Sequence, residues 1–161
     1  MGSGKSSVGK QLAKLIDADF IDSDEEIEKR TGVSIAWIFE KENEAGFRKR
    51  EREIIQSLCQ RKNIIMGTGG GSILAEENRE YLKSTGFIIY LKVSLDEQFA
   101  RTNRRQGARP LLNEPNPKEK LDALNKSRAN IYESLANLTI ETDGKSPKEV
   151  AQLILEKMNF A

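Results

Sequence analysis

The hydrophobic positions of this chain follow two periods that alternate along its length. Short apolar runs are typical of buried strands, and they lie at residues 18–22, 64–66, 87–93 and 138–142. Between the runs, apolar residues recur every three or four positions, as in the helical face formed by Val8, Leu12, Leu15 and Ile16. Strands that alternate with helices predict parallel strands joined by crossovers, so we expect an α/β fold, a three-layer α/β/α sandwich with a parallel sheet.

Polar residues mark where several helices begin. A serine followed three residues later by a glutamate is typical of a capping box, and this pair occurs at Ser23/Glu26, Ser94/Glu97 and Ser146/Glu149. We expect helices to start there, and further helices over residues 43–61, 75–84 and 118–134. Residues 104–117 contain prolines and no apolar period, which predicts a loop.

Composition narrows the class of protein. The 161 residues suit one domain, spanning 1–161, and the net charge of +1 lacks the basic excess of proteins that bind nucleic acid. No apolar run is long enough to span a membrane, and we expect no membrane partner. Cys59 is the only cysteine, which fits the reducing cytoplasm. Because the chain has no histidine, acid–base chemistry falls to carboxylates, lysines or water.

The chain begins with the back half of a phosphate-binding P-loop, G-x-x-x-x-G-K-[ST]. The candidate nucleotide-binding residues are Gly2, Ser3, Gly4, Lys5, Ser6 and Ser7. Backbone N–H groups at a helix start can surround a phosphate, Lys5 would reach the β- and γ-phosphates, and Ser6 would bind Mg²⁺. The first glycine of the pattern and the strand that feeds it fall before Met1. We expect a preceding extension of roughly ten residues to supply both, and the chain without it to be impaired.

A pair of carboxylates follows the first predicted strand. Asp22 ends that strand and suits Mg²⁺ ligation, and Asp24 is a candidate base for a substrate hydroxyl. Acidic residues are also favoured at a helix N-terminus, so capping alone would explain both. Because Ser23 can form the cap, we expect the two carboxylates to be available for chemistry.

Three consecutive glycines, Gly69, Gly70 and Gly71, follow the second predicted strand. Glycine is entropically costly, so this run indicates close approach of the backbone to a ligand. In parallel sheets the ligand lies beyond the carboxyl ends of the strands, where the P-loop, Asp22–Asp24 and this run converge. Arg48 lies among other charges that are typical of a solvated helix face, and composition alone does not single it out.

Taken in order, these motifs resemble shikimate kinases. The matching segments are residues 1–7, Phe20–Asp24, Ile27–Gly32, Gly46–Glu51, Gly67–Ser72, Arg109–Leu112 and Arg128 before Tyr132. The resemblance implies a P-loop kinase that uses ATP and Mg²⁺ to phosphorylate the 3-hydroxyl of shikimate, and we expect a monomer. It also implies a five-stranded parallel sheet in the order 2-3-1-4-5, of which strand 1 is missing from this sequence.

The resemblance assigns roles to individual residues. Asp24 would contact the reacting hydroxyl, Arg48 and Arg128 would hold the carboxylate, and the three glycines would line the ring. Arg101 would lie near the adenine. Arg109 would close over the phosphates with a lid at about 104–117, which makes it, with Lys5 and Asp24, a candidate catalytic residue.

Two alternatives remain from the sequence. One is another P-loop small-molecule kinase, such as a gluconate or nucleoside-monophosphate kinase, against which the Arg109–Leu112 and Gly46–Arg48 motifs count. The other is a ligand-binding form impaired in catalysis because the N-terminal strand is absent, against which four retained residues count: Lys5, Asp22, Asp24 and Arg109.

Overall fold

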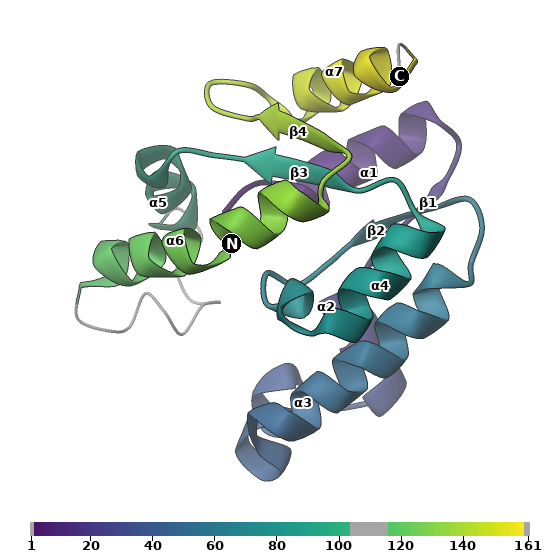
Figure 1. The fold of residues 1–161 in the computed structure, drawn as a ribbon, viewed down its shortest axis with the longest axis vertical. Coiled ribbons are helices and arrows are strands. Elements are labelled where there is room, and N and C mark those ends of the chain that lie inside the picture. The colour runs from purple at the N-terminus through teal and green to yellow at the C-terminus, as the bar shows by residue number, and fades with distance from the viewer. Residues whose placement is uncertain (1, 104–115, 160–161) are drawn as a thin grey trace.

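The computed structural model describes residues 2–103 and 116–159, and in it every strand is followed by at least one helix (Figure 1). The elements are α1 (Lys5–Leu15), β1 (Asp19–Asp22), α2 (Ser23–Thr31), α3 (Ile35–Cys59), β2 (Ile64–Gly67), the 3-10 turn η1 (Ser72–Leu74), α4 (Glu76–Thr85), β3 (Ile89–Lys92), α5 (Leu95–Asn103), α6 (Pro117–Leu135), β4 (Leu138–Glu141) and α7 (Pro147–Asn159). All four expected strands are present, each within a residue or two of the apolar run that predicted it.

The strands pair in parallel, as the alternation with helices predicted. β1 pairs with β2 from Asp19–Ile64 to Asp22–Gly67, and β3 pairs with β4 from Ile89–Leu138 to Lys92–Glu141. In the family order 2-3-1-4-5, β1 to β4 of this chain take the places of strands 2 to 5. Strands 2 and 3 are neighbours in that order, and so are strands 4 and 5, which agrees with the pairing of β1 with β2 and of β3 with β4. Within the described residues no strand lies between β2 and β3, so the strands form two pairs instead of one continuous sheet.

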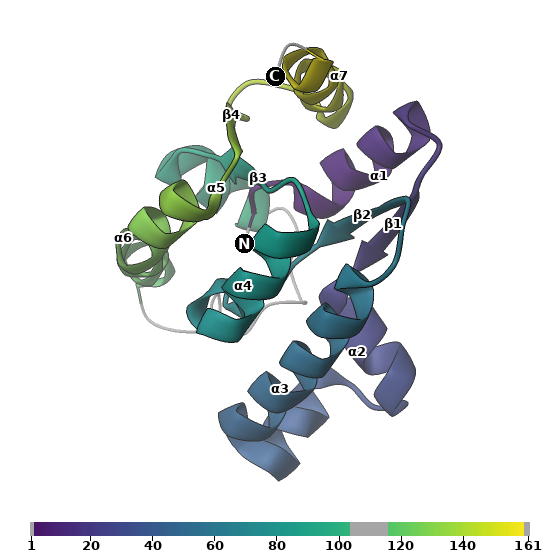
Figure 2. The same ribbon diagram turned by 45° about the vertical axis from the view of Figure 1, so that its right-hand side comes forward.

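Helices cover both faces of these strands. α1 and α7 lie side by side on one face (Figures 1 and 2), and α2 and α3 cover the other face of β1 and β2. Alternate residues of β2 show the two faces, because Ile65 packs with the α1/α7 cluster whereas Ile64 and Met66 pack with the α2/α3 cluster. The three-layer sandwich is therefore present, and it places the ends of β1 and β2 beside the start of α1.

Helix α3 is two helical segments that meet at a kink. Asn43 has φ 60° and ψ −172° inside the helix, and its Oδ1 accepts hydrogen bonds from the N–H groups of Ala45 and Gly46 at 2.9 and 3.4 Å. Asparagine is favoured as a helix cap, so the second segment starts afresh here. The prediction of a helix over residues 43–61 describes this second segment, whereas the first segment was not predicted.

One of the three predicted capping boxes is complete and a second is half formed, because the Ser94 N–H donates to Asp143 and not to Glu97. The Ser146 N–H donates to Glu149 Oε2 at 2.7 Å and the Glu149 N–H donates to Ser146 Oγ at 3.3 Å, and the Glu97 N–H donates to Ser94 Oγ at 3.4 Å. The prediction for Ser23 is wrong, because Asp22 is the N-cap of α2 and its Oδ1 accepts from the Asp24 N–H at 3.0 Å. Aspartate caps helices as well as serine does, and the Ser23 hydroxyl instead accepts a hydrogen bond from the Gly69 N–H.

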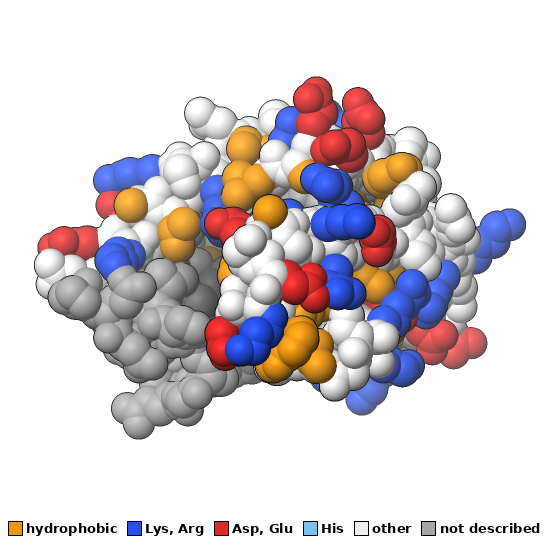
Figure 3. All heavy atoms as spheres, turned by 90° about the horizontal axis from the view of Figure 1, so that it is seen from below, with side chains coloured by type: hydrophobic (Ala, Val, Ile, Leu, Met, Phe, Trp, Pro, Cys, Tyr) orange, Lys and Arg blue, Asp and Glu red, His pale blue; other side chains and the backbone are white. Residues whose placement is uncertain are grey.

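The surface carries both signs of charge. On the face shown in Figure 3, basic and acidic side chains are interspersed with small apolar patches. This mixture is what a net charge of +1 leads one to expect.

Candidate active site

The loop before α1 has the backbone of an anion-binding helix start. Gly4 is the N-cap of α1 with φ 88°, in the left-handed region that favours glycine, and α1 has neither a side-chain cap nor an acidic residue in its first turn. Among the described residues no side chain accepts from its first N–H groups, which form the positive end of the helix dipole. Gly2 lies against α5, where a Cβ would come within 2.9 Å of Gln98 O. This packing fixes the loop on the rest of the fold.

Asp22 connects this loop to the end of β1. Its Oδ2 accepts hydrogen bonds from Lys5 Nζ and Ser6 Oγ, both at 3.1 Å. The side chain of Asp22 is 6% exposed, whereas that of Lys5 is 37% exposed, so the lysine reaches the carboxylate from the solvent side. The sequence predicted that these three residues would meet, and they do.

Asp24 has a half-buried carboxyl group beside the glycine run. Its Oδ1 is buried and has no hydrogen-bond partner among the described residues, and a Cβ on Gly69 would lie 2.9 Å from it. Burial raises the pKa of the Asp24 carboxyl above its ordinary value, and the Asp22 carboxylate raises this pKa further against the opposing charge of Lys5. An unpaired carboxyl oxygen with a raised pKa suits a group that accepts a proton.

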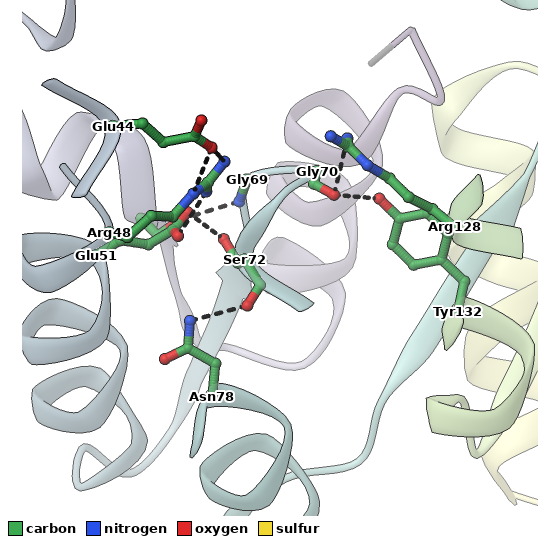
Figure 4. Close-up of polar contacts among 10 residues, drawn as sticks. Glu44, Arg48, Glu51, Gly69, Gly70, Ser72, Asn78, Arg128 and Tyr132 are labelled. Atoms are coloured by element: carbon green, nitrogen blue, oxygen red, sulfur yellow. Dashed lines mark hydrogen bonds and ion pairs between the residues drawn. The ribbon is translucent and has the colours of Figure 1, made fainter. Parts of the chain in front are cut away.

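Arg48 lies on the other side of the same run, on the second segment of α3 (Figure 4). A Cβ on Gly71 would lie 2.6 Å from Arg48 Nη2, so only glycine permits this approach. Arg48 Nη1 donates to Glu51 Oε2 at 2.7 Å, and Nη2 donates to the exposed Glu44 at 3.2 Å. Glu51 is 1% exposed, so the guanidinium is held from below by a buried carboxylate.

Glu51 in turn connects Arg48 to the turn that follows the glycines. Ser72 Oγ donates to Glu51 Oε1 at 2.7 Å, and Asn78 Nδ2 on α4 donates to Ser72 O at 2.8 Å (Figure 4). Asn78 is completely buried, and its Oδ1 has no partner among the described residues. A chain of hydrogen bonds therefore runs from α4 through η1 to α3.

Gly70, in the middle of the run, is approached from α6. Arg128 Nη1 donates to Gly70 O at 3.2 Å, and the Tyr132 hydroxyl donates to the same oxygen at 2.5 Å (Figure 4). Arg48 and Arg128 thus flank the glycine run from opposite sides.

Arg101 lies beside the loop before α1. Its Nη1 and Nη2 donate to Oγ1 and O of Thr142 at 3.2 and 2.9 Å, and its Nε donates to Glu97 at 2.9 Å. A Cβ on Gly4 would lie 3.9 Å from Arg101 Nη1. The guanidinium is therefore close to the P-loop and fixed at the end of β4.

Comparison with known proteins identifies the family. A family model described as shikimate kinase matches residues 1–159. The chain belongs to the shikimate kinase family. It is 50% identical to the shikimate kinase of Actinobacillus pleuropneumoniae serotype 5b over 97% of this chain and 90% of that protein, and 52% identical to that of Coxiella burnetii strain Dugway over 96% and 87%.

Solved structures of shikimate kinases have the same fold. One, from Acinetobacter baumannii in complex with shikimate, has a TM-score of 0.93 and 45% identity over 99% of this chain and 89% of that one. Another, from Aquifex aeolicus, has a TM-score of 0.82 and 34% identity over 99% and 92%. Shikimate kinases are ATP-dependent phosphotransferases acting on an alcohol, so the family prediction is confirmed and another P-loop small-molecule kinase is not favoured.

Several residues of this shikimate kinase site were not predicted. Ser23, Ser72 and Asn78 were missed because their bonds join segments far apart in the sequence. Glu51 could have been found, since an acidic residue three positions after Arg48 lies on the same helical face. Arg109 and residues 104–115 of the expected lid lie outside the described residues.

Within the described residues, no three or more acidic or cysteine side chains gather where they could hold a metal. Within 2–103 and 116–159, no helix is long and apolar enough to cross a bilayer.

Proposed function

We propose that this chain transfers the γ-phosphate of ATP to the 3-hydroxyl of shikimate, a step in aromatic amino-acid biosynthesis. One observation carries the proposal: the glycine run lies against Asp24 at Gly69 and against Arg48 at Gly71, and receives Arg128 at Gly70. One carboxyl group that can accept a proton and two guanidinium groups thus surround a backbone without side chains. This arrangement suits a small ring that bears a hydroxyl and a carboxylate. The similarity to a shikimate-bound structure supports the same substrate.

The nucleotide would bind at the start of α1. The N–H groups of the loop and first turn would surround the phosphates, and Lys5 would exchange its bond to Asp22 for bonds to the β- and γ-phosphates. Arg101, fixed beside Gly4, is placed to contact the adenine end. Arg109 would complete the charge around the phosphates, which stays a prediction.

The residues fit a magnesium ion. Ser6 Oγ and Asp22 Oδ2 lie 3.1 Å apart, and hydroxyl and carboxylate oxygens are ligands that Mg²⁺ accepts while keeping several waters. Bound there, the ion would neutralise charge on the phosphates during transfer.

The acceptor half would work by positioning and by removing one proton. Arg48 and Arg128 would hold the carboxylate, which directs the 3-hydroxyl toward Asp24 and the γ-phosphorus. The hydroxyl oxygen forms the new bond to phosphorus as the bond to the β–γ bridging oxygen breaks, and ADP leaves. Asp24 Oδ1, without a partner among the described residues, accepts the hydroxyl proton, and its raised pKa strengthens it as a base.

A coupled assay of ADP release tests the proposal. Turnover should require shikimate, ATP and Mg²⁺ together. Gluconate and a nucleoside monophosphate are the control acceptors, and turnover with either at a rate equal to that with shikimate would overturn the proposal.

We also propose that the enzyme works in the cytoplasm as a monomer. The single cysteine, Cys59, excludes an internal disulfide and fits a reducing compartment. Sedimentation of the purified protein at assay concentration measures the oligomeric state, and a dimer would contradict the second part.

A further inference from the structure

The carbonyl oxygen of Gly70 accepts hydrogen bonds from two side chains at different distances. Tyr132 OH lies 2.5 Å from it, and Arg128 Nη1 lies 3.2 Å from it. The two side chains are four residues apart on one face of α6 and converge on the same oxygen (Figure 4). The tyrosine makes the closer bond, and the arginine makes the longer one.

The Tyr132 hydroxyl is directed by packing. Its ring stacks on Tyr90 of β3 with centroids 5.0 Å apart and planes 16° apart, which limits its movement. Burial raises the pKa of the Tyr132 hydroxyl, so the group stays protonated and donates throughout the neutral range. Tyr132 is therefore a fixed neutral donor at the centre of the glycine run.

Holding the Gly70 carbonyl also fixes the next amide. The carbonyl of Gly70 and the N–H of Gly71 belong to one planar trans peptide and point in opposite directions. With the carbonyl held toward α6, the Gly71 N–H is directed away from α6. Within the described residues this N–H donates to no acceptor.

We propose that Tyr132 is a positioning residue for shikimate, an inference that rests on the proposed function. Arg128 has further N–H donors and must turn them toward the substrate carboxylate. If it leaves Gly70 O, Tyr132 keeps that carbonyl paired, and leaving this partly buried carbonyl unpaired would be costly. Tyr132 therefore releases Arg128 to the substrate and keeps the Gly71 N–H aimed at it.

The test compares Tyr132→Phe with the matched control Tyr90→Phe. Both variants lose one hydroxyl from the same stacked pair, but within the described residues the Tyr90 hydroxyl has no hydrogen bond. Tyr132→Phe should raise KM for shikimate about 3- to 10-fold, the effect of one hydrogen bond. It should leave kcat and KM for ATP within about twofold, and Tyr90→Phe should change none of them.

Calorimetric titration of shikimate into both variants gives a second measurement that needs no turnover. Tyr132→Phe should fold, because Arg128 still pairs with Gly70 O, and its Kd for shikimate should rise as KM does. Unchanged KM and Kd, a fall in kcat alone, or equal effects of the two variants would overturn the role of Tyr132. Failure of the chain to phosphorylate shikimate both with and without an extension before Met1 would instead overturn the proposed function.

Discussion

Ser23 Oγ accepts a hydrogen bond from the N–H of Gly69 at 3.2 Å, although 46 residues separate them in the chain. Ser23 is completely buried at the first position of α2, so this bond ties the start of that helix to the glycine run. It also holds Gly69 against Asp24. The base and the turn that lines the acceptor site are thus one unit.

Ser23→Ala should therefore weaken both the fold and the acceptor site. A buried N–H left without a partner costs about 1–3 kcal/mol of unfolding free energy, and KM for shikimate should rise. Ser127→Ala is the matched control, because its exposed hydroxyl bonds only within its own helix. Denaturant unfolding and initial rates measure the two effects, and equal losses in both variants would contradict this account.

Asp24→Asn should lower kcat about 100-fold or more, the usual loss for an acid–base group. It should also stabilise the ligand-free protein at pH 7. The pKa of Asp24 is raised in the folded state, so the charge on Asp24 lowers the free energy of unfolding, and the full penalty is reached once the pH exceeds that pKa. The penalty shrinks as pH falls through the folded pKa and vanishes below the ordinary value of 3.8, so the gain in stability should shrink likewise.

Thermal melts of Asp24→Asn and the unmodified chain from neutral to acid pH measure this difference. Asp96→Asn is the control, because Asp96 is exposed at the surface and its pKa is lowered by its bond to Lys118. A melting temperature that falls in Asp24→Asn with kcat unchanged would mean that Asp24 serves only the helix N-terminus.

Glu51→Gln and Glu44→Gln separate the two partners of Arg48. Glu51 is buried and bonds Ser72 as well, whereas the Glu44 side chain is 68% exposed. Glu51→Gln should cost about 1–3 kcal/mol and raise KM for shikimate, because the guanidinium loses its buried charge partner. Glu44→Gln should cost less than about 1 kcal/mol. The same size of effect on unfolding and on KM in both variants would argue against a special role for the buried carboxylate.

Gly71→Ala should impair the acceptor site without unfolding the protein. The new methyl group would lie 2.6 Å from the end of the Arg48 side chain, which can move aside but then leaves its place. KM for shikimate should rise about tenfold, a loss near 1.4 kcal/mol. Gly86→Ala, where the nearest atom is 3.6 Å away, is the control for kinetics and thermal melts. An unchanged KM in Gly71→Ala would show that the run does not need glycine here.

Local patterns found the parts of this site that depend on local chemistry. The P-loop, the four strands and the meeting of Lys5, Ser6 and Asp22 all follow from short motifs and the rule for strand ends. The same reasoning gave the cap of α2 to Ser23, because aspartate and serine cap equally well and only the distant Gly69 decides between them. It predicted the second segment of α3, from residue 43 on, but missed the first segment, which runs from Ile35 to the kink at Asn43.

The kink at Asn43 has a practical consequence for watching this enzyme at work. Trp37, the only indole in the chain, is 43% exposed on the segment of α3 before the kink, and Arg48 lies on the segment after it. All tryptophan emission of the protein therefore comes from Trp37, which is connected through the kink at Asn43 to Arg48, the arginine proposed to bind shikimate. Rapid-mixing fluorescence can time any rearrangement of that segment upon shikimate addition, with no dye attached and no residue replaced.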